Sequence, residues 1–253
     1  MVLRGRSIHG AGAHARIARS PSTCFLRAGL TAQADGTILC SVSATRLLAN
    51  DRLTAAALAL VAGVAWLVTL ATSSHMVMGP AMFVAAWTVM MAAMMLPSAA
   101  PLVLLFSRGA SARATSLLVL GYLAVWAVAG IPAYIGSERM PMSWSPLVLA
   151  AAGVYQLTPA KESCLRKCRT PVDFLMQHWG RSALRLGVEH GLWCLGCCWG
   201  LMAVLVLVGM MGVGWVVGLT IVVALEKLTT RGVAVSRLTG VALLLAAIIQ
   251  GVR

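Results

Sequence analysis

The chain has few acidic residues and few charged residues of any kind. Asp and Glu together number 7 in 253 residues, Lys and Arg number 20, and all charged residues make up 11% of the chain. Soluble globular domains carry about 25% charged residues, so this composition argues against a soluble domain. A Walker-type phosphate loop and an Asp-Lys-Thr-Gly phosphorylation sequence are also missing, so we expect no ATP-driven pump in this chain.

Long apolar runs dominate the sequence instead. Hydrophobic residues make up 60% of the chain, and many form continuous runs near the roughly 20 residues that cross a bilayer. We predict an all-α fold, a polytopic transmembrane helix bundle with six or seven spans and a short amphipathic helical region on the cytoplasmic side. The runs lie near residues 54–73, 82–106, 115–135, 145–160, 187–209, 212–228 and 234–250, and the fourth and seventh are short.

Basic residues gather in alternate connections between these runs, and the connections in between hold almost no charge. By the positive-inside rule, this alternation predicts a multi-pass protein of the bacterial inner membrane with a cytoplasmic N-terminus. The net charge of +13 then follows from topology. We therefore expect the lipid bilayer, with its anionic headgroups, as a partner and no nucleic acid.

The first 45 residues differ from the rest. They are basic, contain a single acid at Asp35, and show no sustained periodicity and no apolar core of a secretory signal. We interpret residues 1–45 as a disordered basic tail and residues 46–253 as a transmembrane metal-binding domain. The tail composition also suits an organelle transit peptide or a start codon assigned too far upstream. Its His and Cys residues have no ligand-like spacing and are assigned no role.

The segment His190 to Trp199 places one imidazole and three thiols inside an apolar run. On an α-helix His190, Cys194 and Cys198 are each one turn apart, and Cys197 lies beside them on the same face. Imidazole and thiolate are ligands for copper(I) and zinc(II). The alternative is that these Cys residues only pack as small hydrophobes.

A second thiol pair lies in a basic segment between two runs. Cys164 and Cys168 are one turn apart if the segment is helical, and Pro159 and Pro171 limit that helix on either side. Basic neighbours favour the thiolate, and a reducing cytoplasm keeps the thiols unpaired. We expect this pair at the cytoplasmic mouth, close to the buried thiols. The alternative is two incidental interfacial Cys residues.

Further candidate ligands flank these groups. Thioethers bind copper(I) but hold zinc poorly, so a methionine stripe on the second run favours copper, although Met also fills apolar cores. The stripe consists of Met90, Met91, Met94 and Met95. Residues His75, Met76 and Met78 form a weaker candidate for the place where the ion enters.

Two acidic positions near these groups, Glu189 and Glu226, have two interpretations each. Glu189 either orients the imidazole of His190 or pairs with Arg185 one turn before it. Glu226 and Lys227 end the sixth run, and we interpret them as marking the cytoplasmic interface; the alternative for Glu226 is a ligand or proton role.

Three sequence blocks resemble a bacterial family of predicted metal-binding integral membrane proteins, a domain of unknown function sometimes labelled a copper chaperone. The blocks are residues 90–101, 155–169 and 187–202, and the resemblance runs from about Leu53 to the C-terminus. It implies a polytopic inner-membrane protein whose metal ligands are Cys164, Cys168, His190, Cys194, Cys197 and Cys198. Glu226-Lys227 also matches a family feature, but Thr229-Thr230 follow where a helix-ending Pro is expected.

We expect a non-enzymatic membrane protein that binds a soft metal ion, first of all copper(I), with zinc or another soft metal as the alternative. It would acquire or deliver the ion, and its partners would be a copper-requiring enzyme or a metallochaperone. A second hypothesis is a transporter for another soft cation, because paired Cys residues in a span and on a cytoplasmic loop follow the logic of mercury-uptake proteins. A third is a membrane thiol–disulfide oxidoreductase using Cys194-Leu-Gly-Cys197, although such relays need thiols on the outer side. A purely structural role is the fourth.

Overall fold

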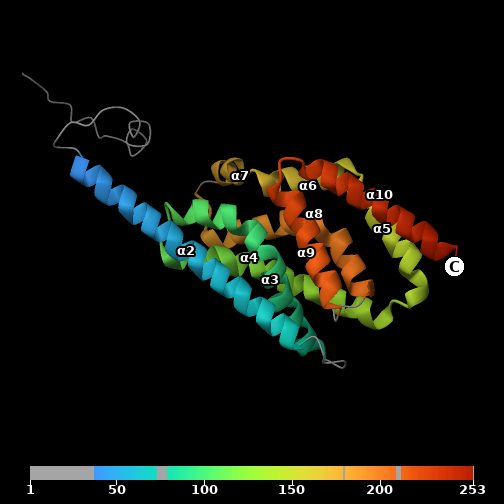
Figure 1. The fold of residues 1–253 in the computed structure, drawn as a ribbon. Helices are drawn as coiled ribbons and strands as arrows, with labels where there is room; N and C mark the ends of the chain where they lie inside the picture. The colour runs from blue at the N-terminus through green and yellow to red at the C-terminus, as the bar shows by residue number, and fades with distance from the viewer. Residues whose placement is uncertain (1–36, 73–78, 179, 209–211, 253) are drawn as a thin grey trace, which may run out of the picture. The chain divides into compact units, whose positions relative to one another are not determined.

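The structure is a computed structural model that describes residues 37–72, 79–178, 180–208 and 212–252, with side chains from residue 51 onward. All of its described regular elements are helices, which confirms the all-α prediction (Figure 1). They are α2 (Thr37–Thr72), α3 (Pro80–Ser107), α4 (Ala112–Arg139), the 3₁₀ turn η1 (Met142–Trp144), α5 (Ser145–Gln156), α6 (Pro159–Arg169), α7 (Pro171–Gln177), α8 (Ala183–Val208), α9 (Val213–Leu228) and α10 (Gly232–Gly251).

The chain divides into two compact units, residues 1–46 and 47–253. In the first unit the structure describes only the start of α2, which begins at Thr37 and so includes the last residues of the predicted tail. Residues 1–36 lie outside the described part of the chain. The second unit holds the site discussed below.

Five helices of the described residues are long and apolar enough to cross a membrane, which indicates a membrane protein. They are Asp51–Thr72, Pro80–Ser107, Ala112–Arg139, Ala183–Leu207 and Gly232–Gly251. Two other predicted spans are shorter than a bilayer requires: α5 has 12 residues and α9 has 16. The predicted seventh run, by contrast, forms the full-length α10. The count of six or seven spans therefore stays a prediction.

Helices α4 and α8 approach each other closely through two glycines. A Cβ on Gly121 would collide with the carbonyl of Leu184, and a Cβ on Gly187 would collide with the carbonyl of Leu118. Small residues at these two positions let the backbones touch, as is common where helices pack within membranes. This crossing fixes the start of α8 and therefore the position of the thiols further along it.

The short helices α6 and α7 begin where the sequence predicted. Each has a Pro in its first turn, at Pro159 and Pro171, where the missing backbone N–H costs nothing. Thr158 caps α6 by accepting a hydrogen bond from the backbone N–H of Lys161. Helix α6 packs against α8 and α9, while α5 and α10 lie side by side (Figure 1). The helix predicted to carry Cys164 and Cys168 is confirmed.

Candidate metal centre

Three thiols on α8 form a compact buried group. The sulfurs of Cys194, Cys197 and Cys198 all lie within 4.8 Å of one another, and each side chain is at most 1% exposed. The Cys197 and Cys198 sulfurs are 3.3 Å apart. Their spacing along α8 turns all three toward the interior of the bundle, as the helical pitch predicted. Three sulfurs at this separation could hold one metal ion.

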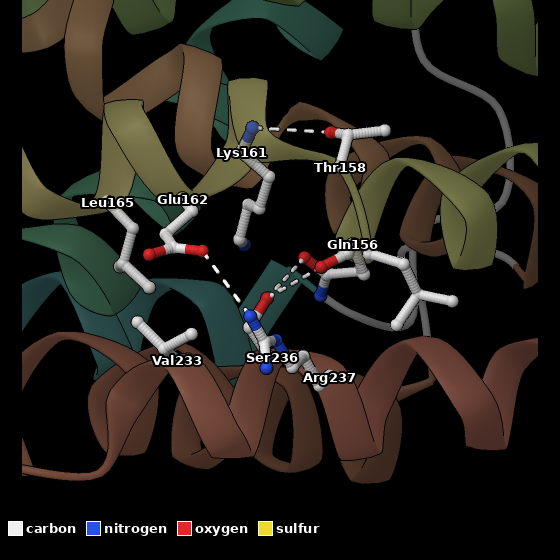
Figure 2. Close-up of a pocket in the computed structure, with 9 residues that line it drawn as sticks. Gln156, Thr158, Lys161, Glu162, Leu165, Val233, Ser236 and Arg237 are labelled. Carbon is white, nitrogen blue, oxygen red and sulfur yellow. Dashed lines mark hydrogen bonds and ion pairs between the residues drawn. The ribbon is translucent and has the colours of Figure 1, made fainter.

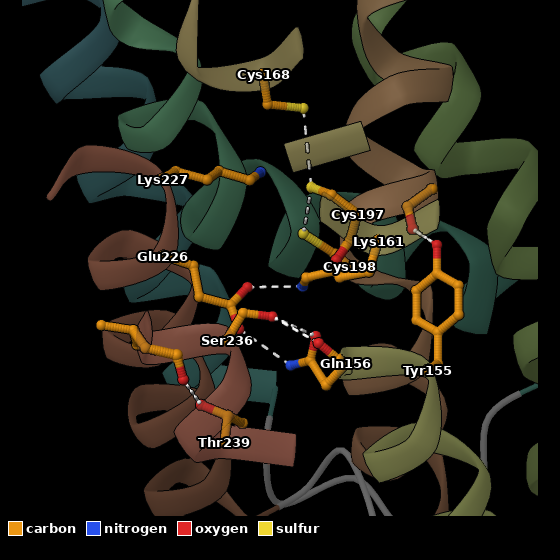
Figure 3. A network of polar contacts seen from close by, with 12 residues as sticks. Tyr155, Gln156, Lys161, Cys168, Cys197, Cys198, Glu226, Lys227, Ser236 and Thr239 are labelled. Atoms are coloured by element: carbon orange, nitrogen blue, oxygen red, sulfur yellow. Dashed lines mark hydrogen bonds and ion pairs between the residues drawn. The ribbon is translucent and has the colours of Figure 1, made fainter. Parts of the chain in front are cut away.

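Helix α6 brings a fourth thiol to this group. The Cys168 sulfur lies 3.8 Å from the Cys197 sulfur, and Figure 3 shows the two side chains pointing toward each other. Cys164 packs against α8 one turn earlier, where a Cβ on Gly196 would lie 3.1 Å from the Cys164 sulfur. The predicted proximity of the two thiol groups is confirmed. Binding of a metal by these residues stays a prediction.

The protonation of Cys168 differs from the expectation. The basic residues on α6 were expected to favour thiolate, but the pKa of Cys168 is raised well above its ordinary value. The main cause is its hydrogen bond to Cys194, with burial acting in the same direction. Both effects favour the thiol form of Cys168 over the thiolate.

A buried ion pair supports the sulfur group from one side. Lys161 is 1% exposed, and its Nζ lies 2.7 Å from Glu226 Oε2 while also donating to the carbonyl of Cys197. Gln156 donates to the other Glu226 oxygen at 3.0 Å, and Ser236 donates in turn to Gln156 (Figure 3). Each oxygen of the buried Glu226 carboxylate thus has a hydrogen-bond partner on another helix.

The pair keeps Lys161 charged. Burial alone would lower the pKa of Lys161, but the neighbouring Cys198 and Glu226 outweigh burial and raise it above the ordinary lysine value. Because the pair is buried, removing either side chain would leave the other charge without a partner.

A second buried lysine contacts the sulfurs directly. The Nζ of Lys227 lies 2.9 Å from the Cys194 sulfur, 3.3 Å from Ser98 Oγ and 3.7 Å from the Met95 sulfur. In Figure 3 its side chain points toward the sulfurs of Cys197 and Cys198. The interpretation of Glu226-Lys227 as an interfacial mark is wrong, because both side chains are buried and reach into the site.

Tyr122 on α4 completes the surroundings of Cys194, and sequence reasoning missed it. Its hydroxyl lies 3.0 Å from the Cys194 sulfur, and its ring is 2% exposed. Nothing in the local sequence marks Tyr122, because its partner is 72 residues away. Lys161, Glu226 and Lys227 could have been found from the sequence, because each is a charged residue inside or beside an apolar helix.

His190 lies apart from the three grouped thiols. Its ring is 3% exposed and packs between Tyr122 and Phe174, with ring centroids 5.9 and 5.2 Å away. Its Nδ1 has no hydrogen-bond partner among the described residues. His190 is therefore not part of the compact sulfur group. Its role as a metal ligand stays a prediction.

Glu189 follows the second of its two interpretations. It pairs with Arg185 at 3.1 Å, with His178 at 3.4 Å, and with Arg181. Its carboxylate therefore contacts basic side chains around the start of α8.

The methionine stripe is part of the core. All four side chains, Met90, Met91, Met94 and Met95, are buried in the same hydrophobic cluster as Cys194, Cys197 and Cys198. Met95 is the member that meets a polar atom of the site, through Lys227. Residues His75, Met76 and Met78 lie outside the described residues.

A small pocket opens beside the ion pair. Its lining comes from α5, α6 and α10 and includes Gln156, Lys161 and Ser236. Glu162 and Arg237, paired at 3.6 Å, border it (Figure 2). The pocket therefore extends from Glu162 on α6 to the buried Lys161.

Comparison with known proteins places the chain in a family. The family model described as PpoB2, copper chaperone, matches residues 84–250, about two thirds of the chain. The matched stretch contains the three sequence blocks at 90–101, 155–169 and 187–202 together with Glu226 and Lys227. No curated protein and no solved structure matches the chain.

Proposed function

The chain belongs to the PpoB2 copper chaperone family, and from this premise we propose that it binds copper(I) in the membrane and acquires or delivers the ion. The observation that carries the proposal is the buried group of three cysteine sulfurs on α8. Thiolates are the protein ligands that soft copper(I) prefers. The recipient would be a copper-requiring enzyme or a soluble metallochaperone.

The compact sulfur group by itself lacks the fourth ligand of a structural zinc site. Structural zinc sites are closed by four ligands drawn from Cys and His. In the described part of the chain the compact group holds three sulfurs, while His190 packs among aromatic rings. Cys168 adds a fourth sulfur from another helix, so zinc is the competing ion that the experiment below includes.

The placement of Cys168 supports delivery rather than storage. It lies on α6, outside the helices that are long enough to span a membrane, and its sulfur is 3.8 Å from that of Cys197. An ion on α8 could pass to Cys168 by exchanging one sulfur for another. We propose no enzymatic step, and the chaperone role needs none.

Metal titration of the full chain tests the proposal. Protein purified anaerobically in detergent is titrated with copper(I) against a chromophoric copper(I) chelator, and its metal content is measured by elemental analysis. We expect about one tightly held copper(I) per chain, matching one compact sulfur group.

Cysteine variants locate the ion. Changing Cys194, Cys197 and Cys198 together to Ser should abolish tight binding, while Cys168→Ser should mainly slow transfer of the ion to the chelator. Cys164→Ser tests whether the other thiol of α6, which also lies outside the compact group, contributes to binding or transfer. Full copper binding by the triple variant would overturn the proposal, and zinc binding that outcompetes copper(I) would redirect it to zinc. Disulfide formation between Cys168 and Cys197 during turnover would favour the oxidoreductase instead.

A further inference from the structure

Lys227 differs from the other buried lysine in having no carboxylate partner. Lys161 and Glu226 form an ion pair, so together they add no net charge to the site. Lys227 donates to Cys194, Ser98 and Met95, and none of the ion pairs of the described residues includes it. An ammonium buried without a carboxylate needs another counter-charge, and a thiolate is the one within reach.

We propose that Lys227 sets the charge of the sulfur site and makes it prefer a monovalent soft cation over a divalent one. The inference rests on the proposed function, since it concerns which ion the same sulfurs hold. Lys227 acts as a positioning and selectivity residue and is not itself a metal ligand.

The geometry places the ammonium close to any bound ion. Lys227 Nζ is 2.9 Å from the Cys194 sulfur, and a metal–sulfur bond is about 2.3 Å. An ion on Cys194 therefore lies within about 5 Å of the ammonium while that contact persists, as the two lengths add. At this separation, inside a buried site, the repulsion between two charges is far larger than in water.

That repulsion discriminates by charge. It is twice as large for a divalent ion as for copper(I) at the same position, because Coulomb energy is proportional to each charge. The loss of thiol protons costs the same for both ions if both take the same sulfurs. The ratio of the two affinities therefore isolates the effect of Lys227 from its effect on thiolate formation.

Substitutions that remove the charge test the proposal. In the full chain, Lys227→Leu removes the ammonium and its hydrogen bonds, Lys227→Gln keeps a donor without the charge, and Lys227→Arg keeps the charge. Copper(I) and zinc(II) affinities are measured by competition with a chelator for each ion. We expect the copper-to-zinc affinity ratio to fall at least about tenfold in the Leu and Gln variants and to stay within about threefold of the wild-type ratio in the Arg variant.

Two further variants guard against a folding effect. Ser98→Asp leaves Lys227 in place and sets a carboxylate where Ser98 Oγ lies 3.3 Å from its Nζ, so it neutralises the ammonium and should also lower the ratio. The matched control is Arg185→Gln, which removes an exposed cation at the start of α8, away from the sulfurs, and should leave the ratio unchanged. Monodisperse elution and thermal unfolding in detergent show which variants keep the fold.

The outcomes separate the two claims. A wild-type chain that binds neither ion tightly overturns the proposed function and this inference with it. If the wild type binds copper(I), an unchanged ratio in the folded neutral variants overturns the inference alone. A ratio that falls in Lys227→Leu but not in Lys227→Gln overturns it too, since hydrogen bonding and not charge would then be responsible. If neither Lys227 variant folds, Ser98→Asp decides in the same way.

Discussion

Charged groups near the start of α8 and those near its middle differ in their exposure to solvent. At the start, Glu189 is 18% exposed and pairs with Arg181 and Arg185, which are 40% and 67% exposed. Further along the same helix, the thiols at Cys194 and Cys197 are 1% exposed and face a buried lysine. Water reaches the two arginines of the first cluster, while in the second each charge needs a partner supplied by the protein.

The difference teaches where polar residues on this helix have large effects. An exposed ion pair contributes at most about 1 kcal/mol, whereas removal of one partner of a buried pair leaves a charge that neither water nor protein compensates. Substitutions near the thiols should therefore change stability and metal binding strongly, and substitutions at the start of α8 should change them little.

The largest effect is expected from Glu226→Gln. It leaves the ammonium of Lys161 buried beside a neutral amide, and breaking a buried pair in this way costs about 3–5 kcal/mol. Thermal unfolding in detergent should show a marked drop in midpoint temperature. The control is Lys161→Met with Glu226→Gln, which leaves no unpaired charge and should recover much of the loss. A Glu226→Gln variant as stable as the wild type would mean that the pair contributes little.

A smaller loss is expected where α4 and α8 cross. Gly187→Ala adds a Cβ against the carbonyl of Leu118, so the helices must separate, and overpacking of this kind costs about 1–3 kcal/mol. The shift should also lower copper(I) affinity, because α8 carries the thiols. Gly218→Ala on α9 is the matched control, since a Cβ there meets nothing within 4 Å. Equal effects of the two substitutions would show that the crossing does not position the site.

Tyr122→Phe probes a single contact of the sulfur group. It removes the hydroxyl 3.0 Å from the Cys194 sulfur and nothing else, and one such hydrogen bond contributes about 1 kcal/mol. We expect a correspondingly modest loss of thermal stability and a change in copper(I) affinity of no more than about tenfold. Tyr134→Phe, on the same helix, should change neither, because no hydrogen bond of its hydroxyl is found among the described residues. If Tyr122→Phe changed neither stability nor copper(I) affinity, the contact between Tyr122 and Cys194 would have no role in the site.

The parts of the site that could be predicted from sequence are those that lie within one helix. The pitch of α8 places Cys194, Cys197 and Cys198 on one side, and the prolines around Cys164 and Cys168 mark a short helix, so spacing alone was sufficient. The family resemblance over three sequence blocks was also confirmed.

The contacts between helices could not be read in the same way. Lys161 and Glu226 are 65 residues apart, and the partners of Lys227 come from α3 and α8. A charge at the end of an apolar run is ordinarily interfacial, which is why Glu226 and Lys227 were assigned to the interface. The packing of α9 against α3, α6, α8 and α10 turns them inward.

The smallest effect is expected at the other region, from Glu189→Gln. Its partners Arg181, Arg185 and His178 remain solvated to differing degrees, so loss of the carboxylate should change stability by no more than about 1 kcal/mol. The change should shrink further at high salt, because salt screens exposed charges. Copper(I) affinity should match the wild type. A loss comparable to that of Glu226→Gln, persisting at high salt, would mean that the start of α8 is coupled to the sulfurs through His190, and the contrast between the two regions would fail.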